Sequence, residues 1–179
     1  MRWFLGMLCL LATASPAQQP VPPPPADSAR VDTAPLPPSP APLPPTPEQA
    51  RYMRGLRTAS RGVAQLKDGV ERVVRSQSGR DTVAQRQAGR RLVGLCSAAS
   101  SFLTNGRAQM RPTAYEDSTR IQARALVMQI DSLLGVMPAC EQGAGRIPDK
   151  VASELLVRLR AYDTAIRTFR SSIGLPNRP

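Results

Sequence analysis

The stretch that decides the fold is residues 148–173, PDKVASELLVRLRAYDTAIRTFRSSI. From Val151 onward its apolar side chains recur every three or four residues, and the strictest run is Leu155, Leu159, Tyr162, Ile166, Phe169 and Ile173. Residues three and four apart are neighbours on a helix surface, so all of these side chains share one face. Pro148 is typical of a first helical turn, whereas Gly174 and Pro176 indicate a helix end. The segment therefore predicts a long amphipathic helix with one buried face.

A second pattern of this kind occupies residues 47–77. Thr46, Pro47 and Gln49 are typical of a helix start, because threonine caps the first amides, proline suits the first turn and glutamine completes a capping box. The apolar residues of this segment again follow spacings of three and four: Tyr52, Leu56, Ala59, Val63, Leu66, Val70 and Val73. Ser78-Gly79 indicates its end. We therefore predict a helix over 47–77 that buries this seam.

Two further helices are expected between these segments. The first runs over residues 81–103, because Asn105-Gly106 is a stop signal. The next begins at a capping box over 113–116 and ends at Pro138, since an interior proline breaks a helix. A loop is then expected over 138–147. The apolar faces are Ala88, Leu92, Leu95, Cys96, Ala99, Phe102 and Leu103 on one helix, and Ala123, Leu126, Val127, Ile130, Leu133, Leu134 and Met137 on the other.

These helices define the expected fold class. No segment alternates apolar and polar residues with the period of two that a half-buried strand requires. Four long amphipathic helices joined by short breaks are typical of an up-down four-helix bundle. We therefore predict an all-α fold, with the bundle over residues 47–175 and a C-terminal tail over 176–179. The alternative is a pair of helical hairpins that completes its core by dimerising.

The N-terminus has the pattern of an export signal. Met1-Arg2 precedes a mostly apolar run over residues 3–14, and Ser15-Pro16-Ala17 is typical of a cleavage site. The run is shorter than the ~20 apolar residues that span a bilayer. We therefore expect residues 1–17 to be a cleaved signal peptide and the mature protein to be periplasmic or extracellular. An uncleaved N-terminal membrane anchor is the alternative.

A proline-rich segment follows the signal. Residues 16–47 contain 14 of the 19 prolines of the chain. Proline fixes φ and removes a backbone donor, so such a segment cannot build a ladder or a core. We predict a disordered linker over 18–46 that acts as an extended spacer. A ligand for an aromatic groove on a partner is the alternative.

Two cysteines remain after signal removal, Cys96 and Cys140. An even number of cysteines in an oxidising compartment favours a disulfide. If the second and third helices met directly at 104–113, however, Cys140 would lie ~24 Å from Cys96 along the helix axes, at 1.5 Å per residue. Bridged Cα atoms lie within ~7 Å of each other. The sequence therefore leaves open a disulfide within the chain, a bond between two chains and, for Cys96, a small core residue.

The chain is strongly basic, with 24 Lys plus Arg against 13 Asp plus Glu and a net charge of +11. On the first helix, four arginines lie away from the apolar seam and are the candidate sites for an anion or a partner: Arg51, Arg54, Arg57 and Arg61. Guanidinium groups suit carboxylates and phosphates. The expected partner is an envelope protein, with anionic lipid or a phosphate polymer as the alternative. Export and an aromatic content of 4% argue against nucleic acid.

Catalytic motifs are missing from the sequence. There is no histidine, so no imidazole base or imidazole metal ligand is available. No Cys-x-x-Cys occurs, and no residue cluster has metal-ligand spacing. We therefore predict no catalytic residues, no metal, no cofactor and no enzymatic activity. The leading hypothesis is an exported helical interaction or scaffold protein, a homodimer being one form of it. Binding to anionic envelope surfaces is the main alternative, and an apolar-ligand carrier is a weaker one.

Overall fold

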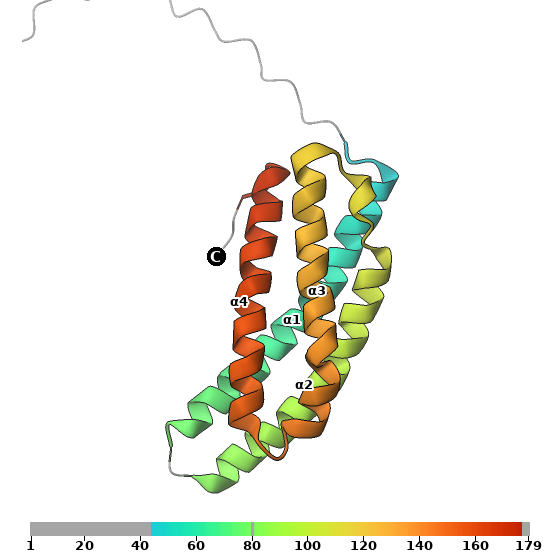
Figure 1. Ribbon diagram of the computed structural model, residues 1–179. Helices are drawn as coiled ribbons and strands as arrows, with labels where there is room; N and C mark the ends of the chain where they lie inside the picture. Colours follow the sequence, from blue (N-terminus) through green and yellow to red (C-terminus); the bar gives the residue numbers. More distant parts are fainter. Residues whose placement is uncertain (1–43, 80, 177–179) are drawn as a thin grey trace, which may run out of the picture. The chain divides into compact units, whose positions relative to one another are not determined.

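The computed structural model describes residues 44–79 and 81–176 (Figure 1). The expected signal peptide, residues 1–17, lies outside this range, as do most of the expected linker and all but one residue of the tail. The elements are α1 (Pro47–Gln77), α2 (Thr82–Gln109), the short 3-10 helix η1 (Pro112–Ala114), α3 (Asp117–Gly143) and α4 (Pro148–Ser172). The all-α prediction is confirmed, since the described residues form four long helices and no strand.

Side-chain caps explain the starts of two of the four long helices, α1 and α2. At α1 the backbone N–H of Gln49 donates to Thr46 Oγ1 at 3.2 Å, and the N–H of Thr46 donates to Gln49 Oε1 at 3.0 Å. The predicted capping box is therefore confirmed. Asp81 caps α2 by accepting from the N–H groups of Val83 and Ala84. The second expected capping box, over 113–116, is wrong, because η1 occupies 112–114 and Glu116 makes no side-chain cap at the start of α3.

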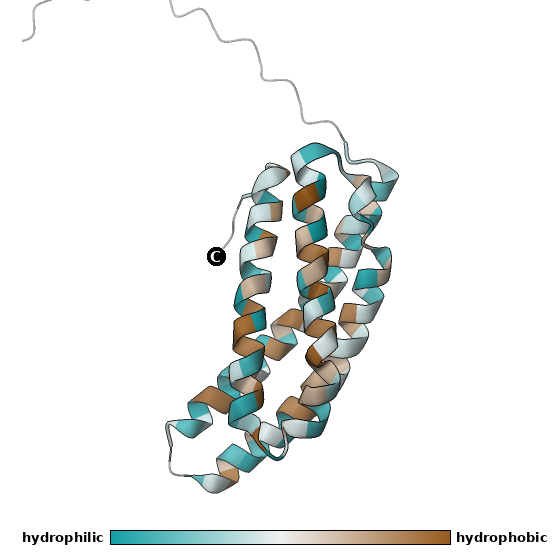
Figure 2. Ribbon diagram, in the orientation of Figure 1, coloured by the Kyte–Doolittle hydropathy of each residue, from teal (hydrophilic) through white to brown (hydrophobic). Residues whose placement is uncertain are grey.

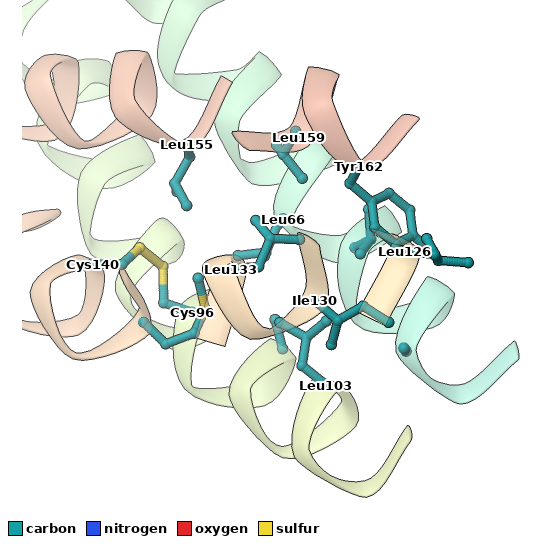
Figure 3. Packing of buried hydrophobic residues seen from close by; sticks show 14 of the residues in the cluster. Leu66, Cys96, Leu103, Leu126, Ile130, Leu133, Cys140, Leu155, Leu159 and Tyr162 are labelled. Atoms are coloured by element: carbon teal, nitrogen blue, oxygen red, sulfur yellow. A yellow bond between two sulfur atoms is a disulfide. The ribbon is translucent and has the colours of Figure 1, made fainter. Parts of the chain in front are cut away.

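The predicted apolar faces meet in one core. The heptad seam of α1 is buried throughout, from Tyr52 to Val73, and Leu155, Leu159 and Phe169 of α4 pack into the same cluster (Figure 3). Ile166 and Ile173 are partly buried at its edge. The ribbon coloured by hydropathy has apolar residues recurring along all four helices (Figure 2). Apolar periodicity therefore identified the core faces correctly.

The helix α2 extends further than expected, through Asn105-Gly106 to Gln109. Gly106 is buried against α1, where a Cβ atom would lie 2.6 Å from the Ala59 nitrogen and 2.6 Å from the Gly55 carbonyl oxygen. This glycine allows the two backbones to approach each other and does not end the helix. The prediction that α2 stops at 103 is therefore wrong.

Glycines also keep the facing side of α1 clear. Gly55, Gly62 and Gly69 recur every seven residues, so all three lie on one face. A Cβ atom at Gly55 would lie 2.6 Å from the carbonyl oxygen of Gly106, and one at Gly62 would lie 2.9 Å from the Phe102 Cβ. The backbones of α1 and α2 therefore approach closely at Gly55 and Gly62, whereas at Gly69 the glycine makes room for the side chains of Leu92 and Leu95.

The helix α3 continues through Pro138 to Gly143, so the expected end at 137 and loop over 138–147 are also wrong. Pro138 is exposed. A proline removes one helical hydrogen bond, and at an exposed site water can solvate the carbonyl that loses its donor. Only the turn over 144–147 separates α3 from α4.

The connection between α2 and α3 sets their register. Its residues Met110 and Tyr115 are buried, so it packs as part of the core. Arg107, near the end of α2, pairs with Asp131 in the middle of α3 at 2.7 Å. The two helices therefore do not meet directly at 104–113, because the connection carries the chain past the end of α2 before α3 begins. The estimated separation of ~24 Å between the cysteines, which assumed that direct meeting and the helical rise, is wrong.

The cysteines consequently lie together. Cys96 and Cys140 form a disulfide with a Cα–Cα distance of 6.1 Å, joining α2 to α3 in the core (Figure 3). Both residues are buried. The bond closes a sequence separation of 44 residues.

Candidate functional site

The four candidate arginines are all exposed on α1, but they do not share one environment. Arg57 and Arg61 line an open pocket between α1 and α4, and Arg57 also lines a second pocket near η1, whereas Arg51 and Arg54 line neither of them. The structure therefore divides the predicted set into a pair at a groove and a pair on open surface.

The groove consists of two adjoining open pockets. The first, about 790 Å³, is lined by Arg57, Arg61 and Ser60 of α1, Ile166 and Arg170 of α4, and a mostly apolar remainder: Met53, Leu56, Ala64, Leu175 and Pro176. The second, about 960 Å³, shares Met53, Arg57 and Leu175 with it and extends toward Thr46 and η1. We refer to these two pockets together as the α1–α4 groove.

The first pocket is positively charged. Its lining contains three arginines, Arg57, Arg61 and Arg170, and no carboxylate. Arg170 donates from Nη2 to the Pro176 carbonyl at 2.8 Å, while its buried Nε has no hydrogen-bond partner within the described residues. The guanidinium groups that line the pocket are suited to bind a carboxylate or phosphate oxygen. The apolar residues beside these guanidinium groups favour a ligand that carries both negative charge and apolar groups.

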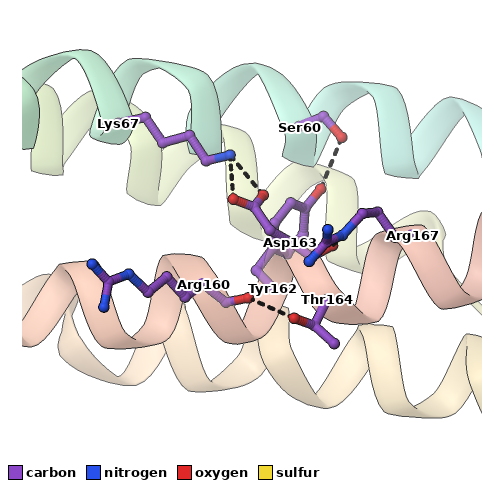
Figure 4. A network of polar contacts seen from close by, with 7 residues as sticks. All are labelled: Ser60, Lys67, Arg160, Tyr162, Asp163, Thr164 and Arg167. Carbon is purple, nitrogen blue, oxygen red and sulfur yellow. Dashed lines mark hydrogen bonds and ion pairs between the residues drawn. The ribbon is translucent and has the colours of Figure 1, made fainter. Parts of the chain in front are cut away.

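Beyond the groove, polar contacts join α1 to α4. Ser60 and the Tyr162 hydroxyl share a hydrogen bond of 2.9 Å, and Lys67 Nζ lies 2.6 Å from Asp163 Oδ1 (Figure 4). Burial raises the pKa of Tyr162 to about 12, although its bond to Ser60 acts in the opposite direction. These contacts hold the two helices together without filling the groove.

An aromatic cluster lies beside the other end of the groove. The rings of Tyr52, Tyr115 and Phe169 contact one another with centroids 5.2–5.3 Å apart. The Tyr52 hydroxyl donates to the Ala123 carbonyl at 2.9 Å, which ties α1 to α3. Burial raises the pKa of Tyr52 and of Tyr115 above the usual tyrosine value. Aromatic contacts of this kind are stabilising, so they hold the start of α1, the residue after η1 and the end of α4 together.

Several groove residues were not identified from the sequence. Met53 lies one position outside the α1 seam, and Leu175 follows the α4 helix, so neither belongs to a periodic face. Ile166 was assigned to the core and is instead partly exposed at the groove. The position of Arg170 off the apolar seam of α4 indicates that its side chain lies on the surface. Which residues of α1 lie beside it depends on how α4 packs against α1.

The described residues contain no group of three or more His, Cys, Asp or Glu side chains placed to hold a metal ion. Comparison with known proteins adds no assignment: no family model, no curated protein and no solved structure matches this chain.

Proposed function

We propose that this chain is a non-enzymatic, exported interaction protein of the cell envelope. In this proposal the helices form an up-down four-helix bundle that a proline-rich linker connects to the N-terminal signal. The bundle binds an acidic, amphipathic segment of a partner protein in the α1–α4 groove. The observation that carries the proposal is the lining of the first pocket of the groove, in which three arginines lie beside apolar side chains and no carboxylate is present.

Charge and shape support a protein segment as the ligand. Guanidinium groups bind carboxylates in two-pronged fashion, and helical segments commonly dock their apolar face in a groove between helices. Arg57 and Arg61 lie one turn apart, at a spacing that suits acidic side chains one turn apart on a partner helix. The mostly apolar wall between them and Leu175 would receive the partner's apolar side chains.

Export is supported by two independent features. Residues 1–17 have the sequence of a signal peptide. The Cys96–Cys140 disulfide is typical of proteins from oxidising compartments. The bundle topology is supported by packing, because each helix contacts the next along the chain and α1 also contacts α4.

The alternative function is binding to an anionic surface, either phospholipid headgroups or a phosphate polymer. The exposed Arg51 and Arg54 favour it, because they add positive charge outside the groove. Such binding depends on total charge and weakens with salt. Binding to an anionic surface would therefore depend equally on all four arginines of α1. Binding of a ligand in the groove would depend on Arg57 and Arg61 more than on Arg51 and Arg54.

This difference provides the test. The tagged full chain is used to capture partners from native envelope extract, and the double variants Arg57→Glu/Arg61→Glu and Arg51→Glu/Arg54→Glu are compared. Both variants change the net charge equally on the same helix, so the second is a matched control. The proposal predicts that the groove variant loses the captured partner by at least about tenfold, while the control keeps it.

Binding to vesicles of anionic phospholipid and to polyphosphate is measured in parallel. Equal loss of vesicle or polyphosphate binding in both variants, with no specific protein captured, would contradict the groove and favour the anionic surface. Capture of the same protein by both variants at unchanged yield would remove the groove as the binding site.

A further inference from the structure

The outer face of α3 carries a second heptad stripe whose large apolar members are exposed. The α4 helix reaches only its edge, where the Arg158 guanidinium donates to Ser132 Oγ. The residues of the stripe follow spacings of four and three: Ile121, Ala125, Met128, Ser132, Gly135 and Ala139. Ile121 is 66% exposed and Met128 is 61% exposed, although both are large and apolar. A Cβ atom at Gly135 would have no neighbour within 4 Å. We refer to these six residues as the α3 stripe.

The stripe makes α3 unusual among the helices. By length and composition, α3 is apolar enough to cross a membrane, yet only 39% of its most apolar window is buried. The hydropathy colouring shows α3 with brown segments along its length (Figure 2). A seam of this spacing is the pattern by which one helix packs against another. At 1.5 Å per residue, residues 121–139 extend along about 27 Å of the helix.

The distribution of residue sizes along the stripe matches an antiparallel second copy. If Ile121 faces Ser132 of the partner subunit, then Met128 faces the partner's Ala125, and symmetry repeats both contacts. Each bulky side chain then packs on a small one. In a parallel copy in register, bulky residues would face each other, and so would small ones, which fills space less well.

Charges beside the stripe fit the same register. Arg124 is exposed and makes no ion pair within the described residues. The antiparallel arrangement brings it opposite the partner's Asp131. Asp131 already faces Arg107 at 2.7 Å and is 47% exposed, so its carboxylate can also accept from a second guanidinium. Two such pairs would form, one at each side of the symmetry axis.

We propose that the α3 stripe is a homodimer interface, in which two copies pack antiparallel through α3. No α3 residue lines the first pocket of the groove, so a dimer would keep that pocket available in both copies. The proposal does not depend on the identity of any groove ligand.

The test measures the mass of the full chain by sedimentation velocity over a range of concentrations. Met128→Glu places a charge in the centre of the expected interface, and the dimer dissociation constant should rise at least about 100-fold. Val157→Glu is the matched control, because Val157 is 67% exposed on α4 and lies off the stripe. The control should remain dimeric, and circular dichroism checks that both variants are folded.

Charge reversal tests the register. Arg124→Asp alone and Asp131→Arg alone should each weaken the dimer about tenfold, and the double variant should recover much of that loss. Independent, additive losses would overturn the antiparallel register.

A wild-type chain that is monomeric throughout would overturn the proposal, as would a dimer that survives Met128→Glu. Binding of monomers to lipid vesicles that is abolished by Met128→Glu and kept by Val157→Glu would instead identify the stripe as a membrane contact.

Discussion

The two contacts that α1 makes with its neighbours are built in opposite ways. Toward α2, Gly55 and Gly62 let backbone atoms of the two helices approach each other, Gly106 does the same from the other helix, and Gly69 makes room for the side chains of Leu92 and Leu95. Toward α4, the buried Tyr52–Phe169 ring contact is accompanied by the Ser60–Tyr162 hydrogen bond and the Lys67–Asp163 ion pair, and an open groove lies beside them. One side of α1 therefore excludes added atoms, whereas the other has room for a ligand.

We infer that one side of α1 contributes mainly to stability and the other side mainly to binding. Close backbone packing leaves no space for change, so we expect the α1–α2 contact to carry a large share of the stability. The half-exposed Lys67–Asp163 pair contributes little to stability, so the exposed part of the α1–α4 side is able to vary at low cost, although Tyr162 itself is buried. The following predictions test this division, from the largest expected effect to the smallest.

Removing the disulfide tests how much stability remains when α2 and α3 are no longer linked covalently and the α1–α2 contact is intact. We expect Cys96→Ala/Cys140→Ala to lower the free energy of unfolding by about 4 kcal/mol, since the bond closes a loop of this length in the unfolded chain. Urea unfolding measures the change, and wild-type protein in reductant should fall to a similar value. A reductant effect that persists in the double variant would show that the loss has another origin.

Filling one glycine should damage the close contact directly. Gly106→Ala places a Cβ atom 2.6 Å from backbone atoms of α1 and should cost about 2–3 kcal/mol. Gly94→Ala is the matched control on the same helix, because nothing lies within 4 Å of a Cβ there. This control should gain about 0.5–1 kcal/mol from helix propensity. Thermal unfolding of both variants gives the sign, and equal signs would contradict the close-packing explanation.

High pH should weaken the α1–α4 side through Tyr162. Its pKa in the folded chain is about 12, above the ordinary value of 10.0, so the folded state keeps a proton that the unfolded state loses. Stability is therefore complete below pH 10 and falls as the pH rises toward 12, by about 1.4 kcal/mol at pH 11 from this group.

Ultraviolet titration measures this effect. The pKa values of Tyr52 and Tyr115 are also raised by burial, and these three are all the tyrosines of the chain. None should ionise near pH 10 while the protein stays folded, and Tyr162→Phe should make the fall in stability shallower. Ionisation of any tyrosine near pH 10 in folded protein would disprove its burial.

The smallest effect is expected for the Lys67–Asp163 pair. Its side chains are 39% and 38% exposed, so a double-mutant cycle with Lys67→Met and Asp163→Asn should give a coupling below about 1 kcal/mol. Urea unfolding at low and high salt measures the coupling, which should decrease with salt. A coupling of several kcal/mol would mean that the α1–α4 side contributes more stability than its exposure indicates.

Sequence periodicity predicted the helices and their core faces, because burial of a helix depends on spacings that are local in the chain. The seam from Tyr52 to Val73 is an example. Helix ends were less predictable: Gly106 and Pro138 both carry stop signals, but both lie inside helices. Gly106 is required by a contact with α1, and Pro138 is exposed, and neither condition can be read from neighbouring residues.

The candidate site was predictable only in part for the same reason. The four arginines of α1 were identified from their position off the seam, and the structure places each of them on the surface. Which of them border a groove depends on where the C-terminal half of α4 lies. Arg57 therefore could not be distinguished from Arg54 by sequence alone. The glycine spacing of α1 was a readable signal for the close contact, but it does not by itself identify the partner helix.

The disulfide also determines which fragments stay covalently joined after the backbone is cleaved. A single cut between Cys96 and Cys140, for example after the exposed Arg111, leaves both fragments covalently joined. A cut after the exposed Arg146 lies outside the closed loop, so only noncovalent contacts would then retain α4. Since α4 forms one wall of the first pocket of the groove, a cut at this turn would leave that wall held by packing alone, whereas after a cut at the α2–α3 connection the disulfide would still join the two fragments.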